Sequence, residues 1–98
     1  MAKSQKTLQV ELRLTVQGNN KFIRGVNKVR EEIERDILSQ YQMEKDGHDY
    51  ILTIPYETDE DLEKTIYDML REAAWAADLK YCIIETDVRA LDGSDRYW

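Results

Sequence analysis

The most constraining feature of the sequence is a strict alternation of apolar and polar residues across positions 8–16. The apolar members are Leu8, Val10, Leu12, Leu14 and Val16. A period of two predicts a β-strand with one buried face and one polar face. Such a strand needs neighbouring strands and a covering layer, so we expect a sheet with helices packed on it.

Two segments show the helical period and can supply that layer. The first is predicted at residues 21 to about 40, after an N-cap at Gly18-Asn19-Asn20, and its apolar arc is Phe22, Ile23, Val26, Val29, Ile33 and Ile37. The second follows "TDED" at 58–61, which resembles a capping box. Its apolar stripe consists of Leu62, Ile66, Met69, Leu70, Ala73 and Ala77.

The remaining strands complete a recognisable order. A short strand from Tyr41 leads to the turn dipeptide Asp46-Gly47, residues 49–57 return, and residues 81–88 form the last strand. Strand, helix, strand, strand, helix, strand predicts an α+β, ferredoxin-like βαββαβ fold. We expect a single domain over residues 1–98, with both helices on one face of a four-stranded antiparallel sheet. A turn at Asp92-Gly93 can add residues 94–98 as a short fifth strand.

Charge is distributed unevenly along the chain. Residues 1–40 carry eight Lys or Arg and five Asp or Glu, whereas residues 41–98 carry six and fifteen, and the total is −6. The net acidity argues against a nucleic-acid partner. The uneven distribution is typical either of a chain that associates with a charged protein or with a second copy, or of two solvated surfaces of opposite charge. One cysteine allows no internal disulfide, and no apolar run nears the ~20 residues of a membrane span. We therefore expect a cytoplasmic protein without a membrane partner.

The segment "VQGNNKFIR" at 16–24 resembles the first loop of the acylphosphatase family, small ferredoxin-like enzymes. The resemblance implies that Gly18 shapes the loop and Arg24 binds an anion. Arg24 lies farther from Gly18 than in that family, and "YQMEKDG" at 41–47 lacks the asparagine that orients water. An anion-binding or acylphosphatase-like domain using Lys21, Arg24 and Lys28 is one alternative function.

Other chemistry has little support. Asp46, His48 and Asp49 lie together in a turn whose composition is typical of a solvated hairpin, so we expect no metal and no cofactor. Cys82 lies in an apolar strand and is expected in the core. The segment "DYILTIPYE" at 49–57 lacks the basic–glycine–aromatic pattern of an RNA recognition motif.

The second helix carries an aromatic residue on its polar side. Trp75 and Leu79 fall opposite the apolar stripe, and Tyr97 and Trp98 end the sequence. Exposed aromatics are enriched at interaction hot spots, although Trp75 can instead stack on Arg71 and Leu79 can close the helix end against Tyr81. We expect a non-enzymatic protein-interaction module, self-associating or docking on another protein through Trp75, Leu79, Tyr97 and Trp98. A second alternative is an acidic decoy that occupies a nucleic-acid-binding surface.

Overall fold

The computed structural model describes residues 6–18, 25–47 and 49–98 and contains four strands, two α-helices and one 3-10 turn. In chain order these are β1 (Lys6–Gly18), α1 (Val26–Asp36), η1 (Leu38–Gln40), β2 (Gln42–Asp46), β3 (Asp49–Tyr56), α2 (Asp59–Asp78) and β4 (Cys82–Ala90). The predicted α+β class, with a four-stranded antiparallel sheet and two helices, is confirmed.

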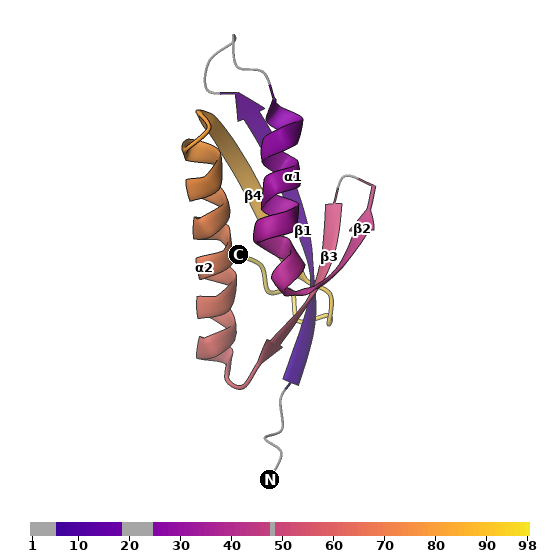
Figure 1. Cartoon of the computed structure of the whole chain (residues 1–98). Coiled ribbons are helices and arrows are strands. Elements are labelled where there is room, and N and C mark those ends of the chain that lie inside the picture. The colour runs from indigo at the N-terminus through magenta and orange to yellow at the C-terminus, as the bar shows by residue number, and fades with distance from the viewer. Residues whose placement is uncertain (1–5, 19–24, 48) are drawn as a thin grey trace.

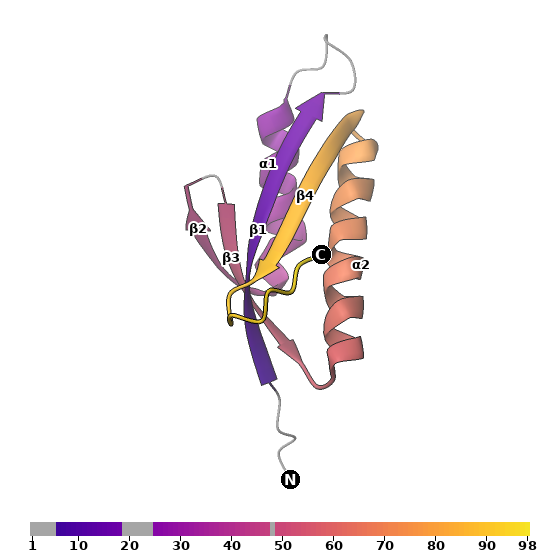
Figure 2. The ribbon, with the colours of Figure 1, turned by 180° about the vertical axis from the view of Figure 1, so that it is seen from behind.

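The strands lie in the order β2-β3-β1-β4, and every neighbouring pair is antiparallel. The long strand β1 is central and pairs with β3 on one side and β4 on the other. Both helices cover one face of the sheet, whose other face is open (Figure 1, Figure 2). None of the helices in the described part of the chain is long and apolar enough to cross a membrane.

The alternation in β1 sorts its side chains between these two faces. Leu8, Val10, Leu12 and Leu14 are buried under the helices, and the buried residues of α2 pack in the same core. The α2 members are Leu62, Ile66, Met69, Ala73 and Ala77, all on the predicted stripe. Cys82 is buried in this core as well, as predicted.

The first helix is shorter than predicted. Its N-cap is Gly25, in the left-handed region with φ of 93°, so the helix begins at Val26 and not at residue 21. A left-handed backbone suits glycine, which has no Cβ to clash. The predicted Asn cap and residues 19–24 lie outside the described residues, whereas at the other end η1 replaces the last helical turn.

The second helix begins as its sequence predicts. Thr58 is the N-cap, and its Oγ1 accepts a hydrogen bond from the Asp61 N–H at 3.1 Å. The Asp61 carboxylate in turn accepts from the Glu57 N–H at 3.2 Å. Three acidic residues in the first turn also complement the positive end of the helix dipole.

The C-terminal segment pairs with the outer edge of β4. Val88 and Trp98 exchange both backbone hydrogen bonds, at 3.1 and 2.8 Å, and the Ala90 N–H donates to the Arg96 carbonyl at 2.8 Å. This pairing is a single antiparallel bridge between Arg89 and Tyr97, not a full fifth strand. The end of the chain lies beside the middle of α2 in both views (Figure 1, Figure 2).

Candidate protein interface

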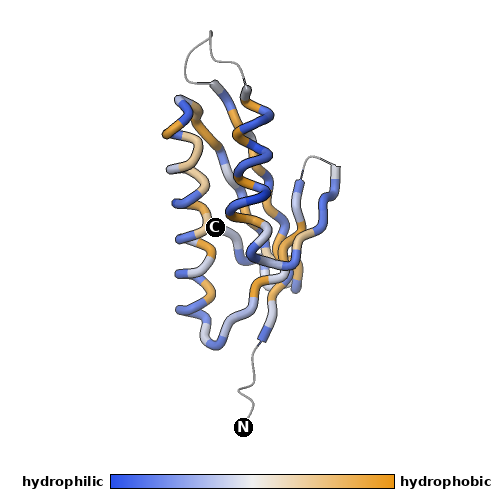
Figure 3. The backbone as a smooth tube through the Cα atoms, in the orientation of Figure 1, coloured by the Kyte–Doolittle hydropathy of each residue, from blue (hydrophilic) through white to orange (hydrophobic). Residues whose placement is uncertain are grey.

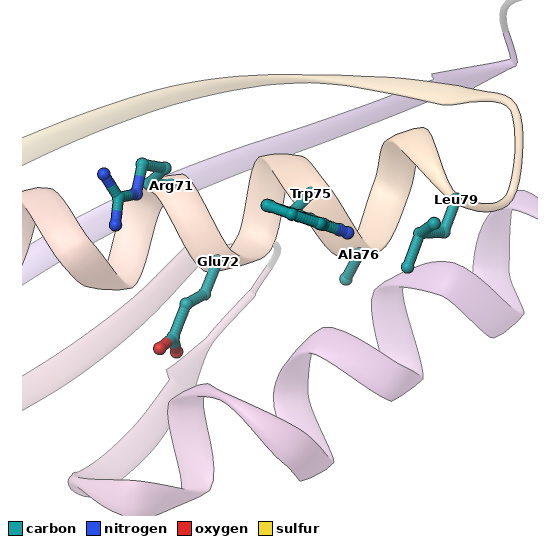
Figure 4. A pocket seen from close by; sticks show the side chains of 5 residues that line it. All are labelled: Arg71, Glu72, Trp75, Ala76 and Leu79. Atoms are coloured by element: carbon teal, nitrogen blue, oxygen red, sulfur yellow. The ribbon is translucent and has the colours of Figure 1, made fainter.

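The outer side of α2 carries a groove lined by Arg71, Glu72, Trp75, Ala76 and Leu79, which we call the α2 patch. The groove encloses about 390 Å³. Trp75 and Leu79 lie one turn apart, and each exposes 67% of its surface. Figure 4 shows Glu72, Ala76 and Leu79 pointing toward the α1 side, with Trp75 across the front of the helix.

Helix geometry explains why Trp75 is exposed. Trp75 follows the buried Ala73 by two residues, which is a turn of about 200° around the helix. The buried stripe already covers the sheet, so Trp75 cannot reach the core without rotating α2. The predicted exposure of Trp75 and Leu79 is confirmed, and their role in binding stays a prediction.

The two intramolecular explanations for these residues do not describe the structure. Among the described residues, the cation–π pairs are Arg30 with Tyr50 and Arg96 with Trp98, and Arg71 points away from Trp75 (Figure 4). At the helix end, Leu79 and Tyr81 remain largely exposed, so neither covers the other. Tyr81 has φ of 59°, and this left-handed residue starts β4 at Cys82, one residue later than predicted.

The two C-terminal aromatics have different surroundings. Trp98 is half-buried against the core, with the Arg96 guanidinium 6.0 Å from its ring centre. Tyr97 bridges to Arg89 and exposes 73% of its surface. Tyr97 therefore lies on the open face of the sheet. Trp98 lies on the face that the helices cover, at the β4 edge.

The candidate anion-binding residues are only partly placed. Lys21 and Arg24 lie outside the described residues. Lys28 is exposed in the first turn of α1 and lines a groove of about 180 Å³ with Gly25, Val29, Glu32 and Lys80. Sequence reasoning missed Lys80, because only the folded chain brings the end of α2 beside the start of α1.

A polar cluster joins α1 to the β2–β3 hairpin. Glu34 accepts a hydrogen bond from the Tyr50 hydroxyl and pairs with the Lys45 ammonium at 2.9 Å. Desolvation and the bond to Glu34 raise the pKa of Tyr50 to about 12. Desolvation alone would raise the pKa of Glu34, but the Tyr50 and Lys45 hydrogen bonds hold it below its usual value. These groups satisfy one another, so we assign the cluster a structural role.

The open face of the sheet carries ion pairs between charged side chains, with Ile83 and Tyr97 also exposed near its β4 edge. Glu11 lies 3.4 Å from Arg89, and Arg13 lies 3.6 Å from Asp49. Tyr50 and Tyr56 belong to the covered face, where Tyr50 is buried. The arrangement offers these two tyrosines no route to stacking on nucleic-acid bases.

The candidate metal turn is likewise only partly placed. Asp46 and Asp49 lie opposite each other across the β2–β3 hairpin, and His48 is outside the described residues.

Comparisons with other proteins identify no relative of this chain. Neither a protein-family model, nor a curated protein, nor a solved structure matches it.

Proposed function

We propose that the protein is a non-enzymatic, cytoplasmic interaction module that docks on another protein through the α2 patch. One observation carries the proposal: Trp75 and Leu79 remain two-thirds exposed on a long helix whose opposite side is fully packed. Tryptophan is among the residue types most enriched at interface hot spots.

The patch has the composition of a small interface. Burying the exposed part of a tryptophan removes on the order of 150 Å² from water, which contributes about 3–4 kcal/mol before association costs. Arg71 and Glu72 form a polar rim around Trp75 and Leu79. Polar rims of this kind contribute more to the orientation and specificity of binding than to its affinity.

Charge narrows the class of partner. Residues 41–98 carry a net charge of −9, and α2 begins with three acidic residues. This field repels nucleic acid and favours a protein surface with basic residues around an apolar centre. We propose such a surface as the partner of the α2 patch.

We assign the scaffold to the ferredoxin-like βαββαβ arrangement. The order of its elements, the strand order β2-β3-β1-β4 and the placement of both helices on one face support the assignment. Folds of this type host unrelated activities, so the functional proposal rests on the α2 patch and not on the fold.

Site-specific photo-crosslinking tests the docking surface. A benzophenone side chain at Glu72 should capture a partner from cell extract, whereas the same group at exposed Lys64, two turns earlier on α2, should not. Trp75→Ser should abolish the capture. Tyr67→Ser is the matched control, because Tyr67 has the same 67% exposure as Trp75 but lies outside the groove. Equal capture from both positions, or capture that survives Trp75→Ser, would refute the proposal.

An activity assay separates this proposal from the acylphosphatase-like alternative. We expect the full chain to show no acyl-phosphate hydrolysis above background, and Arg24→Ala to change nothing. Hydrolysis that disappears in Arg24→Ala would replace the interaction module with an enzyme.

A further inference from the structure

The described residues occupy only half of the outer edge of β4. The C-terminal segment pairs with Val88 and Ala90, while the Leu91 N–H donates to the Gln9 carbonyl on β1. The register of β4 with β1 runs without interruption from Cys82 to Ala90, so even-numbered residues direct their backbone groups outward. Cys82, Ile84 and Thr86 thus present N–H and C=O groups that bond to no other described residue.

We propose that this free half, Cys82–Asp87, adds an extended segment of a partner protein as a new antiparallel strand. It is a second docking surface, separate from the α2 patch. The molecule already shows that the edge accepts a strand, because Arg96–Trp98 pairs with the adjoining half in the same way. A strand on the free half continues that pairing along the same line.

The side chains beside the free edge define the chemistry of the added strand. On the open face, Ile83, Glu85 and Asp87 are exposed. Asp87 lines a groove with Arg13 and Arg89. These two arginines form their ion pairs with Asp49 and Glu11, so among the described residues Glu85 and Asp87 have no ion-pair partner. The added residues that point to this face should therefore be basic. On the other face, Trp98 packs against the core from the adjoining half of the edge. Residues of the added strand that point to the same face as Trp98 should be apolar.

The other edge of the sheet lacks these properties. The exposed run Glu44, Lys45 and Asp46 makes up most of the five-residue strand β2. Short, charged edge strands resist pairing with other chains. Cys82, Ile83 and Ile84 give the β4 edge an apolar start instead, so a partner strand should select β4.

Titration with a synthetic peptide, followed by amide NMR on the full chain, tests the proposal. Ac-Val-Lys-Val-Lys-Val-NH₂ supplies the alternating apolar and basic pattern, and Ac-Val-Glu-Val-Glu-Val-NH₂ is the charge-reversed control. At millimolar peptide, the lysine peptide should slow hydrogen exchange of the Ile84 and Thr86 amides, which point outward. Exchange at Ile83 and Glu85, which bond to β1, should stay unchanged, and the glutamate peptide should have no effect.

Two variants separate the edge from the general acidity of the chain. Thr86→Pro removes an outward N–H for which the described residues provide no acceptor. It should weaken peptide binding at least tenfold while the sheet stays folded. Glu85→Lys with Asp87→Lys should reverse the preference to the glutamate peptide. Glu60→Lys with Glu63→Lys, on α2, makes the same charge change elsewhere and should leave binding unchanged.

Three results would overturn the proposal. The first is unchanged exchange at Ile84 and Thr86 with millimolar lysine peptide. The second is equal binding of the two peptides. The third is protection of these amides by a second copy of the chain as its concentration rises without peptide. Trp75→Ser should not alter peptide binding, so the outcome is independent of the α2 patch.

Discussion

The two helices perform the same structural task and differ in what they show to solvent. Both cover the helix-side face of the sheet, with α1 over its centre and α2 toward the β4 side (Figure 1). Every exposed residue of α1 is polar or charged, namely Asn27, Lys28, Glu31, Arg35 and Asp36. The exposed residues of α2 include Tyr67, Ala74 and Trp75, with Leu79 at its C-cap. Figure 3 shows α1 mostly hydrophilic and the C-terminal part of α2 much less so.

A helix can cover the sheet without apolar residues on its outer side. On α1, polar groups serve the fold: the Arg30 guanidinium donates to the Leu14 carbonyl, and Glu34 accepts from Tyr50. Trp75 and Leu79 on α2 make no comparable contribution. We propose that docking on a partner accounts for their presence.

The largest effect is expected where the helices are alike. Ile33 on α1 and Ile66 on α2 are both fully buried. Replacing either with alanine leaves a cavity and should cost about 2–5 kcal/mol of unfolding free energy, measured in urea. A loss below 1 kcal/mol for one of them would mean that its helix is not part of the common core.

The next largest effect is expected at the C-terminus, where replacing Trp98 should destabilise the fold more than replacing Tyr97. Trp98→Ala removes a half-buried side chain and should cost about 2 kcal/mol, roughly half the usual penalty for a fully buried aromatic. Tyr97→Ala is the matched control, since Tyr97 is exposed, and should stay within about 0.5 kcal/mol. Equal thermal melts for the two variants would show that Trp98 does not secure the edge of β4.

The polar cluster of α1 should give a smaller, pH-dependent effect. Tyr50→Phe removes the bond to Glu34 and should cost about 1 kcal/mol at pH 7. The folded pKa of Tyr50, about 12, exceeds the value of 10 in the unfolded chain, so wild-type stability falls from pH 10 toward 12. This alkaline loss should shrink in Tyr50→Phe, and an unchanged profile would contradict the assignment.

The pH dependence of stability that comes from Glu34, in the same cluster, has the opposite sign. The folded pKa of Glu34 lies below its usual 4.5, so its contribution is complete above that pH and is lost as pH falls further. Glu34→Gln should therefore flatten the stability profile below pH 4.5 in acid-unfolding measurements. Glu31→Gln, on the exposed side of α1, is the control and should leave the acid limb as it is.

Much of this architecture could be predicted from periodicity. The alternation in β1, the stripe of α2 and the Thr58 cap depend on local spacing, and the structure has them where expected. The predicted start of α1 is wrong because Gly25 interrupts the helix, although apolar residues continue at the helical spacing on both sides of Gly25. The spacing of apolar residues does not predict the backbone conformation of one glycine between them.

The candidate site was predicted unevenly for a similar reason. Trp75 and Leu79 could be placed because helix phase alone decides their exposure. The different surroundings of Tyr97 and Trp98 depend on pairing with β4, and the approach of Lys28 to Lys80 depends on tertiary packing. Neither leaves a local pattern in the sequence.

We propose that Trp75 and Leu79 serve docking and not folding. The most direct measurement is the unfolding free energy, in urea, of Trp75→Ser combined with Leu79→Ser at low protein concentration. We predict a value within about 1 kcal/mol of the wild type, because both side chains are exposed and Leu79 caps α2 through its backbone N–H, which serine keeps. A loss of 2 kcal/mol or more, comparable to that of Ile66→Ala, would show that these side chains stabilise the fold and would contradict their assignment to docking.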